Sequence, residues 1–146
     1  MKNAEVLNDL VEINNDRIEG YEKAASQAKD PDLTSLFTEM ANQSKELVSE
    51  LRELVRAEGE EPAKGTTARG KIYRAWMDVK KPFGGGDRKS ILASCEFGED
   101  AAQRAYESAL KEDDITSSVR QVLEKEKSTL RASHDRIRDM RDAASS

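Results

Sequence analysis

The chain has little of what marks several common classes of protein. It holds one cysteine, Cys95, and one histidine, His134, among its 146 residues. A lone cysteine cannot form an internal disulfide, which is typical of proteins from a reducing compartment. No apolar run approaches the roughly 18 residues needed to cross a bilayer, and the N-terminus lacks the apolar core of a signal peptide. These absences predict a cytoplasmic protein.

Aromatic residues are also scarce, at 5% of the chain, whereas charged residues make up 36% and the net charge is −5. Such a balance suits long amphipathic helices with solvated outer faces. The acidic total argues against nucleic-acid binding by the chain as a whole. The length predicts a single domain, residues 1–146, large enough to bury a hydrophobic core.

Proline is rare, and its three positions, Pro31, Pro62 and Pro82, fall between segments with helical periodicity. Because proline removes a backbone donor and clashes with the preceding turn, these residues mark connections. Asp30 is expected to cap the N-terminus of the second helix and Gly59 to end it. The apolar periodicity predicts helices over about 3–28, 32–58, 88–111 and 115–143.

The two halves of the chain share a local pattern. Tyr21-Glu22-Lys23-Ala24 precedes one short polar turn, and Tyr106-Glu107-Ser108-Ala109 precedes another. Short turns within each half predict two antiparallel hairpins, and the long crossover 59–87 can span the length of a bundle. The predicted fold is therefore all-α, a ferritin-like four-helix bundle. Two hairpins that pair only across a dimer are the alternative.

The crossover is expected to contain a short amphipathic helix over 71–81. Ile72, Trp76 and Val79 lie on one side of it, and this side is predicted to dock against the bundle. Trp76 is the only tryptophan in the chain, and the docking is expected to bury it.

Two glycines, Gly20 and Gly98, stand inside predicted helices. A glycine there costs about 1 kcal/mol relative to alanine. Close approach of a neighbouring side chain or of the crossover is the expected compensation.

The segment 64–89 is strongly basic, with eight Lys or Arg residues and two acids. One interpretation is that it lies against its own acidic bundle or against a second copy of the chain. The other is that it binds nucleic acid or an anionic membrane through Lys71, Arg74 and Lys80.

Several uncommon residues recur in order along the chain and together carry a resemblance. They are Gly65-Thr66, Gly70, 74–80, 91–93, 95–100, Tyr106 and 133–138. In these motifs the chain resembles a family of bacterial ferritin-like four-helix-bundle proteins catalogued only as a domain of unknown function. The resemblance implies the fold and, as a general character, a role in stress response.

A working ferritin-like centre needs about four carboxylates and two imidazoles around two metal ions. The resemblance implies a glutamate seven residues before an inward tyrosine on the first and third helices. Glu99 precedes Tyr106 by seven residues, but Asn14 stands seven before Tyr21. With His134 as the sole histidine, two imidazoles cannot be supplied. The pattern predicts a degenerate di-iron site that lacks a complete di-metal centre.

On the second helix, Ser44 and Leu47 occupy the inward positions where a glutamate and a histidine would be expected. The register of the fourth helix leaves open whether Glu126 or Lys127 faces inward. A reduced site could still hold one Fe or Mn ion. Its weak candidate ligands are Glu99, Glu126, His134 and Glu96.

The alternative is a polar network inside the bundle that sets the helix register without binding any ligand. Its expected members are Asn14, Tyr21, Glu99, Tyr106 and His134. Cys95 falls on an apolar stripe, where a buried and unreactive thiol is expected.

The leading hypothesis is a structural or interaction module that is not an enzyme and carries no cofactor. The alternatives are divalent-metal binding at the reduced site and binding of an anionic partner by the crossover. Whether the chain forms a homo-oligomer is left open.

Overall fold

The computed structural model describes residues 3–67, 76–77 and 88–144. Within these ranges the chain forms four helices and no strand, which confirms the prediction of an all-α protein with four helices. The observed helix ends differ from the predicted ones by at most two residues. The helices are α1 (Asn3–Gln27), α2 (Pro31–Ala57), α4 (Arg88–Leu110) and α5 (Ser117–Ala143).

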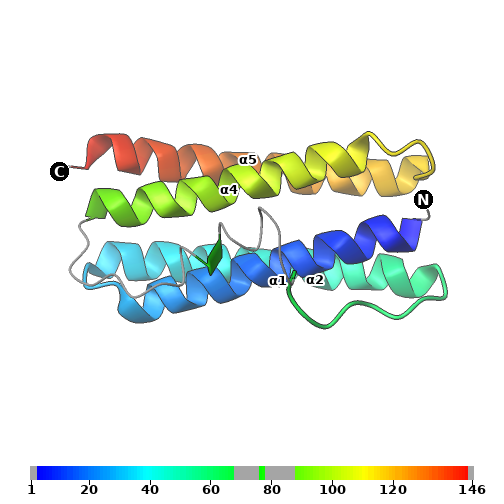
Figure 1. Ribbon diagram of the computed structural model, residues 1–146, viewed down its shortest axis with the longest axis horizontal. Coiled ribbons are helices and arrows are strands. Elements are labelled where there is room, and N and C mark those ends of the chain that lie inside the picture. Colours follow the sequence, from blue (N-terminus) through cyan, green and yellow to red (C-terminus); the bar gives the residue numbers. More distant parts are fainter. Residues whose placement is uncertain (1–2, 68–75, 78–87, 145–146) are drawn as a thin grey trace.

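The four helices pack into a bundle made of two antiparallel pairs, α1 with α2 and α4 with α5 (Figure 1). Contacts also join α1 to α4 and α2 to α5, so each helix touches two neighbours. Helix α4 begins at the opposite end of the bundle from the end of α2, and these two helices run in the same direction (Figure 1). None of the described helices is long and apolar enough to cross a membrane.

The helix ends follow from local chemistry. Pro31 is the first residue of α2, where its missing N–H needs no partner. Gly59 follows α2 with a φ of +79°, and its left-handed conformation ends the helix as predicted. Asp30 occupies the cap position but makes no side-chain cap. Asp30 is thus the N-cap residue, as predicted, but its carboxylate binds the guanidinium of Arg88 at 3.1 Å instead of a backbone N–H of α2.

The apolar interior falls into two clusters at opposite ends of the bundle. One contains Leu7, Leu10, Val11, Leu51, Val55 and Leu123, and the other contains Leu33, Phe37, Met40, Trp76, Leu92 and Ile137. Buried polar residues lie between them along each helix: Asn14 and Arg17 on α1, Ser44 on α2, Glu99 on α4 and Glu126 on α5. The middle of the bundle is therefore a polar layer between two apolar cores.

Trp76 is fully buried, as predicted. Its ring lies against α1 and α4, where a Cβ added to Gly20 or to Gly98 would come within 2.7 Å or 2.9 Å of the indole. The prediction that close approach compensates for these two glycines is thus confirmed. Ile72 and Val79, the other expected docking residues, lie outside the described residues, as does most of the predicted short helix.

Polar side chains of α1 form hydrogen bonds with the first part of the connection that follows α2. Asn8 donates to the carbonyl of Glu61 at 3.1 Å and accepts from the backbone N–H of Ala63 at 2.8 Å. Asn15 donates to the carbonyl of Gly65 at 2.9 Å. The Asp16 carboxylate accepts from the backbone N–H of Thr67 at 3.2 Å. Residues 61–67 are thereby held along α1.

Substitution of Gly98 by alanine tests the fit of the indole. In the parent chain we expect Gly98→Ala to lower the free energy of unfolding by about 1–3 kcal/mol, because the new methyl group overpacks the ring. In a Trp76→Ala background the same change should be neutral, or stabilising by up to about 1 kcal/mol, because only helix propensity remains. Urea unfolding measures both. Stabilisation by Gly98→Ala in the parent would show that the indole does not lie there.

Candidate functional site

The centre of the polar layer is an ion pair between Arg17 of α1 and Glu99 of α4. The guanidinium Nε donates to Oε2 of Glu99 at 2.7 Å and Nη2 donates to Oε1 at 3.2 Å. Both side chains have 0% exposure. The Tyr21 hydroxyl donates to the same Oε2 at 2.9 Å, so both oxygens of Glu99 are occupied by protein donors.

Arg17 uses all five of its N–H donors. The remaining three go to α2: Nη1 donates to the Met40 carbonyl at 3.2 Å and to Ser44 Oγ at 2.8 Å, and Nη2 donates to Met40 Sδ at 3.4 Å. The guanidinium carbon also lies 5.2 Å from the centre of the Tyr21 ring, a cation–π contact. These partners together offset the cost of removing the guanidinium from water.

The hydrogen bonds continue from Arg17 across the bundle in one direction. Ser44 Oγ donates to Asn14 Oδ1 at 2.9 Å, and Asn14 Nδ2 donates to the Tyr106 hydroxyl at 2.8 Å. Tyr106 in turn donates to Oε1 of Glu126 at 2.8 Å. The relay therefore links all four helices, from a cation on α1 to a carboxyl group on α5.

The charges at the two ends of this relay are set by burial and by their neighbours. Burial alone would lower the pKa of Arg17, but the Glu99 carboxylate outweighs it and leaves that pKa above its ordinary value. Burial, aided by the nearby Glu50 carboxyl group and opposed by the Tyr106 hydroxyl, raises the pKa of Glu126 to about 9. Glu126 is therefore protonated at neutral pH, and the Arg17–Glu99 pair cancels in charge.

The other reactive groups of the interior are held in their neutral forms. Burial, followed by the adjacent carboxyl group, raises the pKa of Tyr21 and of Tyr106 well above the usual value for a phenol. Burial also raises the pKa of the Cys95 thiol. A thiol that stays protonated is a poor nucleophile, and the polar layer offers no base to activate it among the described contacts.

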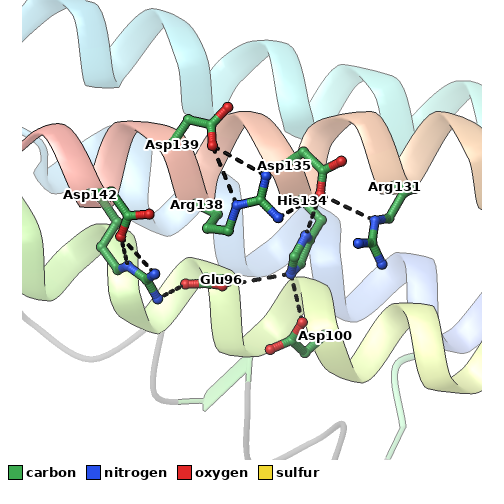
Figure 2. A network of polar contacts seen from close by, with 9 residues as sticks. Glu96, Asp100, Arg131, His134, Asp135, Arg138, Asp139 and Asp142 are labelled. Atoms are coloured by element: carbon green, nitrogen blue, oxygen red, sulfur yellow. Dashed lines mark hydrogen bonds and ion pairs between the residues drawn. The ribbon is translucent and has the colours of Figure 1, made fainter.

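A second group of ionisable residues lies at the edge of the α4–α5 interface (Figure 2). His134 Nε2 is 2.7 Å from Asp100 Oδ1 and 3.7 Å from Glu96 Oε2. Within the described part of the chain, these three residues are the group whose ligand atoms all come within 4.8 Å of one another. Nitrogen and carboxylate oxygen are both common ligands of divalent metals.

Further charged residues surround this group. His134 Nδ1 lies 2.9 Å from Asp135 Oδ1, and that carboxylate also contacts Arg131 at 3.1 Å and Arg138 at 3.4 Å. The hydrogen bond to His134, aided by the two arginines, lowers the pKa of Asp135. Arg141 binds the other oxygen of Glu96.

The structure distributes the sequence-derived candidates over these two places. Asn14, Tyr21, Glu99 and Tyr106 all belong to the polar layer, but His134 does not, because it lies with Asp100 and Asp135. Glu99, Glu126 and His134, the predicted reduced metal site, therefore do not share one site among the described residues. Glu126, not Lys127, is the buried residue of its pair.

Two residues were missed by the sequence analysis. Arg17 is not among the interior candidates named there, although it lies three residues after Asn14 and four before Tyr21. Asp100 is not among the metal-ligand candidates named there, although it stands four residues after Glu96, on the same helical face. The anionic-partner candidates Lys71, Arg74 and Lys80 lie outside the described residues.

Comparison with models of protein families gives a match. The model of a family described as "Domain of unknown function (DUF2383)" matches residues 2–112. The matched region spans α1, α2 and α4 and ends before α5, so it includes Arg17, Ser44 and Glu99 but not His134. No curated protein matches the sequence.

Removal of one partner of the Arg17–Glu99 ion pair should strongly destabilise the fold. We expect Arg17→Ala to lower the free energy of unfolding by about 3–5 kcal/mol, because it leaves the Glu99 carboxylate buried without a counter-charge. The double variant Arg17→Met with Glu99→Leu should lose much less, since neither charge remains. Lys45→Ala is the control: its pair with Glu22 has both side chains 52% exposed and should be worth less than about 1 kcal/mol. Equal losses for the single and double variants in urea unfolding would contradict this account.

The raised pKa of Glu126 predicts a pH dependence of stability. The native state holds this proton up to a pH of about 9, its raised pKa, whereas the ordinary pKa of a glutamate carboxyl group is 4.5. Between these values the native state binds more protons than the unfolded state. The free energy of unfolding should therefore fall as pH rises through this window, by up to about 1.4 kcal/mol per pH unit.

Glu126→Gln should remove this contribution, and Glu124→Gln, at an exposed neighbouring position, should leave it unchanged. Urea unfolding at several pH values between 5 and 9 measures the slope. An identical slope in Glu126→Gln and the parent chain would show that Glu126 does not titrate abnormally.

Proposed function

Because the chain belongs to the DUF2383 family of unknown function, we propose its role from its own residues: a non-catalytic ferritin-like bundle that serves as a structural or interaction module in the bacterial cytoplasm. The four-helix arrangement, with α2 and α4 running in the same direction, supports the ferritin-like assignment. The interior of the bundle supports the absence of di-metal chemistry.

One observation carries this proposal. The guanidinium of Arg17 occupies the interior beside Glu99 and takes both carboxylate oxygens. A di-metal centre needs inward carboxylates with free lone pairs to balance the charge of two ions. Here the positive charge comes from the protein itself, and it cannot dissociate as an ion can.

The remaining interior groups favour the same conclusion. Glu126 is protonated at neutral pH because its pKa is about 9, so binding a cation would first cost the loss of that proton. Asn14 and Ser44 spend their polar atoms on the relay between Arg17 and Tyr106. A polar layer whose charged and polar groups bond one another makes the bundle rigid, which suits a structural role.

Metal loading tests the proposal. Untagged protein should be incubated anaerobically with ferrous ion, separated from free metal, analysed for iron, and then exposed to oxygen. We expect at most one ion per chain and no absorbance from an oxo-bridged iron pair. Two ions per chain, with the stoichiometry reduced by Glu99→Gln but not by Asp100→Asn, would overturn the proposal. The two variants separate interior binding from binding at the α4–α5 edge.

A further inference from the structure

We propose that Glu96, Asp100 and His134 form a binding site for one first-row divalent transition-metal ion at the edge of the α4–α5 interface. This site is distinct from the interior polar layer, and it does not depend on the scaffold role proposed above. It also differs from the reduced site expected from the sequence, because Asp100 replaces Glu99 and Glu126 as the partner of His134.

The helices bring the three side chains together. Glu96 and Asp100 stand four residues apart on α4, which places them on one face, and His134 reaches them from α5 (Figure 2). Their ligand atoms lie within 4.8 Å of one another. A tetrahedral ion with bonds near 2.1 Å needs its ligand atoms about 3.4 Å apart. The distance of 3.7 Å from His134 Nε2 to Glu96 Oε2 is close to that value.

The distance between Asp100 and His134 must lengthen to admit an ion, and Asp100 is able to move. Its oxygen is 2.7 Å from His134 Nε2, a hydrogen-bond distance, and its side chain is 42% exposed, whereas that of His134 is 8% exposed. A small rotation of this half-exposed carboxylate opens the space for an ion between the two atoms. The imidazole itself stays in place.

The orientation of the imidazole is set from its other side. Asp135 accepts from Nδ1 at 2.9 Å and is itself held by Arg131 and Arg138. A carboxylate on one ring nitrogen of histidine commonly fixes the tautomer and turns the other nitrogen toward a metal. Here that other nitrogen, Nε2, faces Glu96 and Asp100.

The local charge also favours a divalent cation. The network drawn in Figure 2 joins five carboxylates to three guanidinium groups, and His134 adds no charge when neutral. Two negative charges are left over, which one divalent ion neutralises. Arg141 binds Glu96 and is the cation with which the metal competes for that carboxylate. The imidazole ligand favours a transition-metal ion such as Zn²⁺ over Mg²⁺ or Ca²⁺.

The single histidine makes the test direct, because its ring gives one set of imidazole resonances. Untagged, ¹⁵N-labelled protein should be titrated with Zn²⁺ in one series and with Mn²⁺ in another. We expect Zn²⁺ to shift the Nε2 resonance of His134 while Nδ1 keeps its proton. We expect Mn²⁺ to broaden the ring signals first, together with the amide signals near residues 96 and 100. Calorimetry should give one Zn²⁺ per chain.

Matched variants separate a built site from adventitious binding. Asp100→Asn and His134→Gln should each weaken Zn²⁺ binding by about tenfold or more, and Asp135→Asn by about 10- to 100-fold through loss of orientation. Glu124→Gln, at an exposed position on the same helix outside this network, should leave the affinity unchanged. Arg141→Gln should tighten binding, because it frees Glu96. Circular dichroism should show that each variant keeps its helix content.

Two results would overturn the proposal. One is the absence of saturable 1:1 binding with no shift of the His134 ring signals, which would leave the group as an ion-pair network alone. The other is an affinity that Asp100→Asn and Glu124→Gln change equally, which would show that the ion responds only to the acidity of the surface.

Discussion

The Arg17–Glu99 ion pair fixes how the helices meet in the middle of this bundle. Removing two charges from water costs several kcal/mol per ion unless close partners and further hydrogen bonds compensate. Arg17 meets this requirement only if Glu99 of α4 and Met40 and Ser44 of α2 lie at set positions around it. A slip of one helix by a residue would break several of these contacts together. The apolar clusters on either side supply most of the stabilisation, and the polar layer supplies the register.

The burial of Trp76 protects this ion pair. The indole fits between Gly20 of α1 and Gly98 of α4, the residue next to Glu99 in the sequence. It also packs edge-on against Tyr21, with ring centres 5.3 Å apart, and Tyr21 donates to the Glu99 carboxylate. Because a low local dielectric strengthens hydrogen bonds to a charge, the exclusion of water by the indole makes the pair stronger. The two glycines and the ion pair thus belong to one arrangement.

The sequence predicted what depends on local pattern and missed what depends on pairing across the bundle. Apolar periodicity, three prolines and Gly59 were enough to place four helices and their ends. The glycines in α1 and α4 correctly indicated a close approach. Arg17 was missed because an arginine usually faces solvent, and its burial requires acceptors from two other helices. His134 was misplaced because the register of α5 against α4 cannot be derived from either helix alone.

Helix α4 divides its acidic residues between two environments within little more than one turn. At about 100° per residue, Glu96 and Asp100 point about 40° apart, whereas Glu99 points about 100° away from Asp100. A ligand shared by Glu99 and His134 would require α4 to rotate, and the bonds from Arg17 and Tyr21 to Glu99 oppose that rotation. The same guanidinium that closes the interior to metal ions therefore holds Glu96 and Asp100 toward α5. A closed scaffold and a cation site at its edge follow from one helix orientation.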